Sequence, residues 1–436
     1  MNENLVHIEA FDCLPFPADK INANVLQEFI QSQNENKFWF TTFGQDKDAP
    51  LADFDHRAYC WNAGRFIGEA DFEYNQQKYR ITIKPRFGER MLFRMLEEIF
   101  NIRITSSASQ NSNKAEWKHF IKRIIAFIWL QKLANANLHG VPKMQQKREY
   151  RGQTVRGKLD IRKTINPYYS NNEMISVYPE KHVDEVIAAI IFQAYQILKN
   201  DFEIGTVNIP ESAQESINQV HSKIHKKRHI KEQDYQNIRY KDIYLSWKPI
   251  VDFSWEIIKR KRLSLKRDKN KNGFGFFIDM AEVWEQYLRA ILRKNLTPLG
   301  WHYRNEKQIA YKEKFYRREL IPDLVFQKEN EVAIWDAKYK RMNGKYWDVD
   351  RSDFFQIHTY IQHFLHHKEV KSGGLFYPVS DKQVNFENYS SPYLMNEEGM
   401  RMNFVIDGMQ LKEQEEIENS HQLENEFVSR IIKYIS

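Results

Sequence analysis

The sequence has few cysteines, few glycines and no long uncharged apolar run. Its 2 cysteines are too few for a disulfide framework or a zinc site built on thiolates, and they suit a reducing cytosol. We interpret both, Cys13 and Cys60, as core residues. The chain has 16 glycines and no G-x-x-x-x-G-K-[ST] segment, so we expect no nucleotide site of its own.

Membrane and secretory signals are also missing from the sequence. The longest apolar helix, around Ile121–Leu133, is interrupted by Lys122, Arg123 and Lys132, so we expect no membrane span. The first residues, MNENLVHIEAFD, have no basic region followed by an apolar run, which argues against a secretory signal. We therefore expect a cytoplasmic protein with no membrane partner.

The composition is that of a globular, basic protein. The 436 residues are 42% hydrophobic and 14% aromatic, which predicts two or three domains with packed cores. A net charge of +7 favours a polyanionic partner, most often nucleic acid. Two basic blocks stand out, His225–Lys231 and Lys259–Lys271; each fits a solvated helix face or loop as well as a DNA contact.

Three regions follow one another along the chain. Residues 1–105 predict a strand-rich domain, with strands at 38–43, 64–74 and 78–87 and helices at 22–33 and 91–100. Residues 106–272 predict a mainly helical region after a polar linker at 106–114, with these segments: an amphipathic helix at 117–140 ending at Gly140, a basic strand-like segment at 147–164, and helices at 182–200 and 212–229.

Residues 273–436 alternate helices and strands. The pattern predicts a helix at 274–296 with Asp279 and Glu282 in capping-box positions, two strands within 322–340, a helix at 352–367, a strand at 373–379 and a terminal helix within 411–436. This order indicates an α/β domain, α+β for the whole chain, with a mixed sheet flanked by helices.

The stretch PDLVFQKENEVAIWDAKYK places two aspartates and a lysine on apolar strands. Asp336 and Lys338 are two apart and share one strand face, and a hairpin would bring Asp323 beside Asp336. Such a carboxylate pair suits Mg²⁺ or Mn²⁺, and the lysine adds positive charge near a scissile phosphate. This pattern predicts phosphodiester hydrolysis; the alternative is a surface salt bridge between Asp336 and Lys338.

Residues on both sides extend this candidate site. Gln356 and Tyr360 are four apart on one helix face; the glutamine can hold the lysine or a phosphate, and the tyrosine can pack beside DNA. Upstream, Glu285 could turn toward the metal, with Glu282 as a competitor. On spacing alone, helix packing is the favoured interpretation of Gln356 and Tyr360. Four histidines late in the same helix suit its negative end and receive no metal role: His358, His363, His366 and His367.

Together, the Pro322-Asp323, Asp336-x-Lys338 and Gln356-x-x-x-Tyr360 motifs resemble the PD-(D/E)xK nuclease superfamily and its RecB-like branch. More of the chain resembles the McrC family, the nuclease subunits of McrBC modification-dependent restriction systems. The segments that carry this resemblance are RITIKPRFG, Arg156–Asp160, FFIDMAEVWEQYL and SDFFQIHTY.

The resemblance implies roles for the site residues and names partners. Asp323, Asp336 and Lys338 would be the catalytic triad and Glu285 the supporting acid, with Gln356 and Tyr360 completing the site. The implied cofactor is Mg²⁺ or Mn²⁺, held by Asp323, Asp336 and Glu285. The implied partners are a hexameric McrB-like AAA+ GTPase, contacted by residues 1–105, and double-stranded DNA, usually methylated.

Three hypotheses follow for the function. The first is a metal-dependent DNA endonuclease subunit that acts with a GTPase or ATPase ring. The second is a non-catalytic scaffold that activates the ring, and the third is a nuclease that works without a ring. The intact Asp323, Asp336 and Lys338 favour catalysis over a scaffold.

Overall fold

The chain forms two compact units. The computed structural model describes residues 5–17, 24–28, 50–56, 58–100, 114–202, 204, 209–223, 230–267, 275–305, 308–309, 319–340, 349–379, 390–392, 402–411 and 417–436. One unit combines Met1–Ala108 with Lys271–Ser436, and the other is Ser109–Asn270. The predicted strand at 38–43, the linker up to residue 113 and nearly all side chains of the two basic blocks lie outside the described residues.

The first sheet of the larger unit has the strand order β1-β5-β4-β9. Its strands are β1 (Leu5–Phe11), β4 (Phe66–Tyr74), β5 (Gln77–Lys84) and β9 (Gly275–Asp279). β1 runs parallel to β5, and β4 is antiparallel to both β5 and β9. A hairpin of β2 (Ala52–Asp55) and β3 (Cys60–Ala63) lies between β1 and β4 in the sequence. Helix α2 (Gly88–Phe100) follows β5. The strands predicted at 64–74 and 78–87 and the helix predicted at 91–100 are confirmed.

The prediction of a helix over 274–296 is wrong at its start. Gly275–Asp279 forms strand β9, and helix α9 (Met280–Leu296) begins only afterwards. Phe277 and Ile278 are both buried, so this short apolar run is compatible with a buried strand as well as a helix. Asp279 does cap the helix, because its Oδ1 accepts a hydrogen bond from the Ala281 backbone at 2.9 Å.

The smaller unit is mainly helical, as predicted. Its longer helices are α3 (Lys114–Ala136), α5 (Glu185–Asp201), α6 (Glu211–Lys223) and α8 (Lys248–Arg267). The expected amphipathic stripe of α3 is wrong, because every side chain from Ile124 to Leu130 is buried. α3 contacts both α6 and α8, so it is the central helix of this unit and has apolar neighbours on more than one side.

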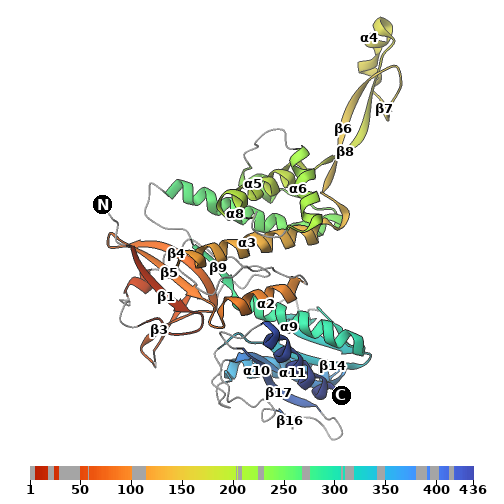
Figure 1. The fold of residues 1–436 in the computed structure, drawn as a ribbon. Coiled ribbons are helices and arrows are strands. Elements are labelled where there is room, and N and C mark those ends of the chain that lie inside the picture. The colour runs from red at the N-terminus through yellow and green to blue at the C-terminus, as the bar shows by residue number, and fades with distance from the viewer. Residues whose placement is uncertain are drawn as a thin grey trace, which may run out of the picture. The chain divides into compact units, whose positions relative to one another are not determined.

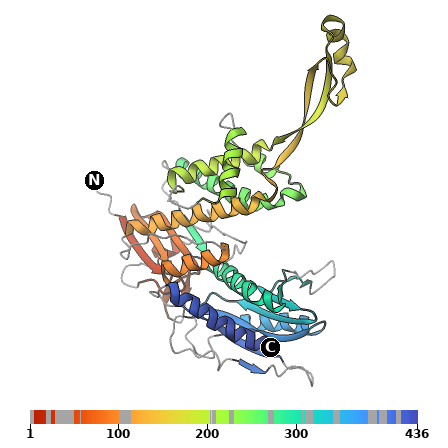
Figure 2. The ribbon, with the colours of Figure 1, turned by 45° about the vertical axis from the view of Figure 1, so that its right-hand side comes forward.

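A strand arm extends from the helices of the smaller unit (Figures 1 and 2). It consists of β6 (Lys143–Gly152), β7 (Lys158–Leu159) and β8 (Met174–Val183), with helix α4 (Ile161–Asn171) packed on β8. The predicted basic strand-like segment is thus confirmed over β6 and β7, whereas its last residues begin α4. Most side chains of β6 are exposed.

The second sheet of the larger unit has six strands in the order β10-β13-β14-β15-β17-β16. These are β10 (His302–Tyr303), β13 (Leu324–Lys328), β14 (Glu331–Ala337), β15 (Glu369–Val379), β16 (Ser390–Pro392) and β17 (Asn403–Gln410). β14, β15 and β17 are parallel, and β13 is antiparallel to β14. Helix α10 (Arg351–Leu365) makes the crossover from β14 to β15. The mixed sheet flanked by helices is therefore confirmed.

The side-chain period of the strands divides this sheet into two apolar faces. On one face, Val332 and Ile334 of β14 join the core with Ile357 and Ile361 of α10. On the other face, Phe376 of β15 packs against Trp335 and against Phe427 of helix α11 (Ile417–Ile435). Helices α9 and α11 contact each other on this second side (Figure 2), so the sheet is covered on both faces.

A buried ion pair joins the beginning and the end of the larger unit. Arg94 of α2 binds the Glu424 carboxylate of α11 through two hydrogen bonds of 2.8 and 2.7 Å. Tyr287 of α9 donates to the same carboxylate at 2.8 Å. These contacts explain how residues before 109 and after 270 share one unit. No helix in the described part of the chain combines the length and apolarity needed to cross a bilayer.

Candidate active site

Asp323 and Asp336 lie at the same end of two paired strands. Leu324 of β13 is opposite Trp335 of β14, so one further step of this register sets Asp323 level with Asp336. The Oδ2 atom of Asp323 accepts a hydrogen bond from the backbone N–H of Ala337 at 2.9 Å. The predicted hairpin is confirmed, and its turn is only Glu329 and Asn330, because β13 includes Gln327 and Lys328.

The strands themselves form because their side chains are buried on both faces of the sheet. Leu324–Phe326 and Val332–Asp336 are all buried, which is typical of central strands covered by helices on both sides. A carboxylate on such a buried, apolar strand is disfavoured unless a partner compensates its charge. Asp336, only 2% exposed, therefore requires a cation close by.

Lys338 supplies that cation and continues into a chain of hydrogen bonds. Its Nζ lies 2.5 Å from Oδ2 of Asp336 and donates to Oε1 of Gln356 at 2.9 Å. Gln356 in turn donates from Nε2 to the Tyr360 hydroxyl at 2.8 Å. The expected contact between the glutamine and the lysine is confirmed. The alternative prediction, a salt bridge between Asp336 and Lys338, is correct in its partners, but the pair is not at the surface, because these side chains are 2% and 15% exposed.

The burial of Tyr360 argues against the expected packing of its ring beside DNA. The Tyr360 ring belongs to the core between α10 and the sheet and is 7% exposed. Its hydroxyl orients Gln356, whose side chain is exposed. The helix spacing placed both residues on one face correctly, but the apolar ring of the tyrosine is buried and the glutamine is left at the surface.

The sequence reasoning missed Asp353 and Lys340. Asp353 of α10 is buried, 3.6 Å from Nζ of Lys338 and 2.7 Å from Nζ of Lys340. Its signal was present, because Asp353 precedes Gln356 by three residues and so lies on the same helix face. Lys338 is consequently held from two sides, by a strand carboxylate and by a helix carboxylate.

Glu285 reaches this end of the sheet from α9, as predicted, but with a partner of its own. It forms an ion pair with Arg289 one turn later, and Arg289 also donates to the backbone carbonyl of Asp323 at 3.1 Å. Glu282, the competing residue, has a carboxylate oxygen that is buried. Of the two, Glu285 is the acid whose charge acts on Asp323 and Asp336.

The crowding of carboxylates changes their affinity for protons. Burial, together with the charges of Asp336 and Glu285, raises the pKa of Asp323 well above its usual range. Burial likewise raises the pKa of Glu285, with Asp336 adding to the effect and Arg289 opposing it. For Lys338, burial disfavours the charged form, but the carboxylates of Asp336 and Asp353 outweigh it and raise its pKa. The site is thus rich in negative charge that lacks full compensation.

A divalent cation fits this donor set. Carboxylate oxygens are the ligands that Mg²⁺ and Mn²⁺ prefer, and a cation held by Asp323 and Asp336 would relieve the repulsion that, together with burial, raises the pKa of Asp323. Within the ranges that the structure describes, no three His, Cys, Asp or Glu side chains already form a metal-binding group. The fit therefore rests on two carboxylates, with Glu285 currently engaged by Arg289.

Tyr339 and Lys340, which follow Lys338, contact Arg86 in the loop between β5 and α2. Tyr339 is buried, and the Arg86 guanidinium lies over its ring at 4.6 Å. Arg86 also donates to the backbone carbonyl of Lys340 at 3.1 Å. Asp12, which is fully buried, accepts from the Arg86 backbone at 2.6 Å. The two residues after Lys338 are therefore held by Arg86 of the N-terminal region.

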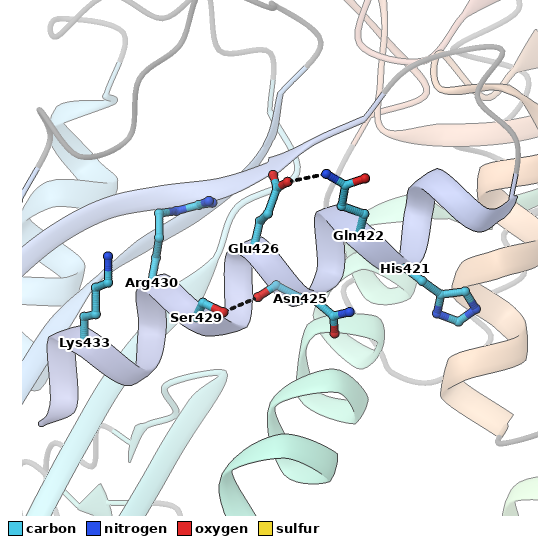
Figure 3. A pocket seen from close by; sticks show the side chains of 7 residues that line it. All are labelled: His421, Gln422, Asn425, Glu426, Ser429, Arg430 and Lys433. Carbon is cyan, nitrogen blue, oxygen red and sulfur yellow. Dashed lines mark hydrogen bonds between the residues drawn. The ribbon is translucent and has the colours of Figure 1, made fainter.

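A hollow on the surface of α11 is a weaker candidate for an active site. It has a volume of about 620 Å³, and Figure 3 shows that the seven side chains lining it come from this single helix. Two of them pair along the helix, Gln422 donating to Glu426 at 2.9 Å. Arg430 is committed to buried Asp407, at 2.9 Å. The hollow is polar helix surface and offers no convergent catalytic groups.

Comparison with known proteins identifies one family. A family model described as McrBC 5-methylcytosine restriction system component matches residues 62–378, a range that includes every predicted site residue. No match was found among curated proteins.

Two solved structures resemble the chain. One is a chain of the refined half-complex from a tetradecameric assembly of Thermococcus gammatolerans McrB AAA+ hexamers with bound McrC. It has a TM-score of 0.51 at 13% identity and covers 98% of this chain and 100% of that chain. The other is from the cryo-EM structure of the Thermococcus gammatolerans McrBC complex, with a TM-score of 0.35 at 12% identity, covering 67% of this chain and 88% of that chain. At this identity the first match supports a shared fold.

Proposed function

Because the chain belongs to the McrBC 5-methylcytosine restriction system component family, we propose that it is the DNA-cleaving subunit of such a system. The activity would be metal-dependent hydrolysis of DNA phosphodiesters. The observation that carries this proposal is the meeting of Asp323, Asp336 and Lys338 at one strand end, with Lys338 bound to Gln356 at 2.9 Å. A scaffold needs no such cluster of buried carboxylates around a lysine.

Asp323 and Asp336 are the proposed metal ligands, with Glu285 contributing negative charge from α9. A bound Mg²⁺ or Mn²⁺ supplies an acidified water and neutralises charge on the phosphate. The Asp323 carboxylate is oriented by the Ala337 N–H, so its other oxygen is the one available for the cation. Rigid, paired strands keep the two carboxylates at a constant separation, which preorganised sites require.

Lys338 is the proposed electrostatic group for the scissile phosphate. Its ammonium is held between Asp336 and Gln356, and the charges around it keep it protonated at neutral pH. A cation bound to Asp336 would weaken the attraction between Asp336 and Lys338. The Lys338 ammonium would then be available to interact with the phosphate. Gln356 limits its movement, and Tyr360 in turn limits Gln356.

The proposed partners are double-stranded DNA and an AAA+ ring. The matching solved structure has McrB AAA+ hexamers with bound McrC, and the sequence lacks a P-loop. We therefore assign nucleotide hydrolysis to the partner, and also the reading of a modified cytosine. Contact of the ring with residues 1–105 remains a prediction.

The test is plasmid cleavage by the purified chain with Mg²⁺, with and without its AAA+ partner and nucleotide. Asp336→Asn is expected to abolish cleavage. Glu331→Gln is the matched control, because Glu331 begins the same strand at its opposite end. Cleavage that survives Asp336→Asn would rule out the proposed site. Partner-independent cleavage would favour the stand-alone nuclease, and stimulation of the partner's hydrolysis without any cleavage would favour the scaffold.

A further inference from the structure

A second cleft opens on the α10 side of the sheet, away from the carboxylates. It has a volume of about 200 Å³ and is lined by residues of three elements: Arg304 after β10, Val325 and Gln327 of β13, and His363, Phe364, His367 and Lys368 at the end of α10. None of these lining residues is acidic. The cleft therefore combines two permanent cations with two imidazoles.

The cations of this cleft are not used by the fold. Within the described part of the chain, neither Arg304 nor Lys368 has an ion-pair partner. The neighbouring acid, Glu369, points its carboxylate to Lys371 at 2.7 Å. The main chain of both residues is fixed, since the backbone N–H of Arg304 donates to the Val325 carbonyl at 2.8 Å and that of Lys368 to the Phe364 carbonyl at 2.9 Å.

The histidines add hydrogen-bonding groups to the cleft. The rings of His363 and His367 lie 6.3 Å apart. Burial lowers the pKa of His363, and the nearby His367 and His366 lower it further. At neutral pH His363 is therefore an uncharged imidazole that can donate one hydrogen bond. His358, by contrast, is already paired with the Phe354 carbonyl at 2.8 Å.

The cleft lies on the same face as the candidate active site. Asp323, Val325 and Gln327 alternate with residues of the opposite face, so Gln327 is roughly 13 Å from Asp323 at about 3.3 Å per residue. On α10, Gln356, Tyr360 and His363 follow one helix face, and His363 is roughly 4.5 Å beyond Tyr360 at 1.5 Å per residue. Each DNA strand carries a phosphate about every 3.4 Å of helix axis. The separation therefore corresponds to a few nucleotides.

We infer that the cleft between Arg304 and Lys368 binds a backbone phosphate of the DNA substrate, a few nucleotides from the scissile bond. Arg304 and Lys368 supply the charge, and His363 and His367 supply hydrogen bonds. This inference rests on the proposed nuclease function for the identity of the polyanion. The role of such a contact is to set the register of the strand across Asp323 and Asp336, because phosphate contacts position a nucleic acid without reading its sequence.

The test is binding of a labelled short DNA duplex by the full chain, alone and with its AAA+ partner, as a function of salt. Replacing Arg304→Gln and Lys368→Gln together is expected to weaken binding about fivefold per cation and to reduce the salt slope by about 0.9 for each lost contact. Lys328→Gln is the control, because Lys328 is exposed on the same strand and points to the opposite face. Equal effects of control and double variant, no effect of the double variant, or no DNA binding by the wild-type chain at low salt would each overturn the inference.

A second experiment identifies the source of the phosphate. Duplexes with a single neutral methylphosphonate are expected to lose affinity for the wild-type chain at one position and to lose nothing further in the double variant. If no position matters and millimolar inorganic phosphate displaces the duplex, the cleft binds free phosphate and the backbone assignment is wrong.

The outcome also separates this inference from the proposed function. If Asp336→Asn still cleaves while the double variant binds DNA poorly, the nuclease assignment fails and the phosphate site stands. If Asp336→Asn abolishes cleavage while the double variant binds and cleaves normally, the phosphate site fails and the nuclease assignment stands.

Discussion

Asp323 accepts a hydrogen bond from the backbone N–H of Ala337 at 2.9 Å. This single contact ties the end of one strand to the strand that carries Asp336 and leads to Lys338. It holds two carboxylates close together although their charges repel, and burial together with this repulsion raises the pKa of Asp323. The fold therefore maintains a destabilising arrangement at this place, as functional sites often do.

Asp323→Asn is expected to stabilise the chain at pH 8. A carboxyl group with a raised pKa binds its proton more tightly when folded, so its contribution to stability decreases as pH rises from the unfolded pKa through the folded one. The amide keeps the acceptor for Ala337 and removes the charge. We expect a rise in Tm of roughly 2 to 4 °C, corresponding to about 1 kcal/mol, that shrinks toward pH 4. An unchanged or lower Tm at pH 8 would contradict the strained-site interpretation.

Mg²⁺ is expected to raise the Tm of the wild-type chain, because a ligand that binds only the folded state stabilises it. At about 100 times its Kd the gain is roughly 2.7 kcal/mol. Asp336→Asn should abolish the shift, and Glu285→Gln should weaken the affinity for Mg²⁺ roughly tenfold, as loss of an outer partner does. Isothermal titration calorimetry provides the affinities. An equal Mg²⁺ response in wild type and Asp336→Asn would exclude Asp336 as a ligand.

Lys338→Met is expected to reduce DNA cleavage at least about a hundredfold, the loss typical of removing one transition-state donor. Gln356→Ala should reduce it less, because the ammonium loses its support and keeps its charge. Lys340→Met is the control, since Lys340 is exposed and pairs with Asp350 and Asp353 outside the carboxylate pair. Single-turnover rates distinguish these variants. Similar losses for Lys338→Met and Lys340→Met would indicate a general charge effect.

Arg94→Met is expected to destabilise the larger unit by about 3 to 5 kcal/mol, because it leaves the buried Glu424 carboxylate without its cation. Lys294→Met removes a cation whose side chain is 63% exposed, and its effect should stay below about 1 kcal/mol. Urea unfolding followed by circular dichroism measures both. If Arg94→Met left stability unchanged, the joining of α2 to α11 would not depend on this ion pair.

Local patterns were sufficient to predict the hairpin and helix α10, whereas the contact of Gln356 with Lys338 was one of two options that the sequence left open. Each depends on residues close in sequence, where periods of two and about four residues decide which side chains meet. Asp353 was missed although the same helix spacing contained it. Arg289 could not be found this way, because its contact with the Asp323 carbonyl joins residues 34 apart.

The wrong predictions at β9 and α3 have a common cause, which is contact between elements far apart in the sequence. β9 pairs with a strand some 200 residues earlier, Phe66 opposite Asp279, and nothing in the local sequence of Gly275–Asp279 indicates that partner. The burial of α3 on more than one side similarly depends on α6 and α8. Burial on both sides hides the periodicity from which amphipathic elements are predicted.

The sequence by itself determined the chemistry of this protein: which residue types are present, their spacing of two on a strand and four on a helix, and the lack of a P-loop. Only the tertiary structure decided how that chemistry is arranged. It buried Asp336 beside Lys338, turned Tyr360 into the core, engaged Glu285 with Arg289 and set Arg304 near Lys368. The physical reason is that charge compensation and burial depend on neighbours in space, which the order of residues along the chain does not specify.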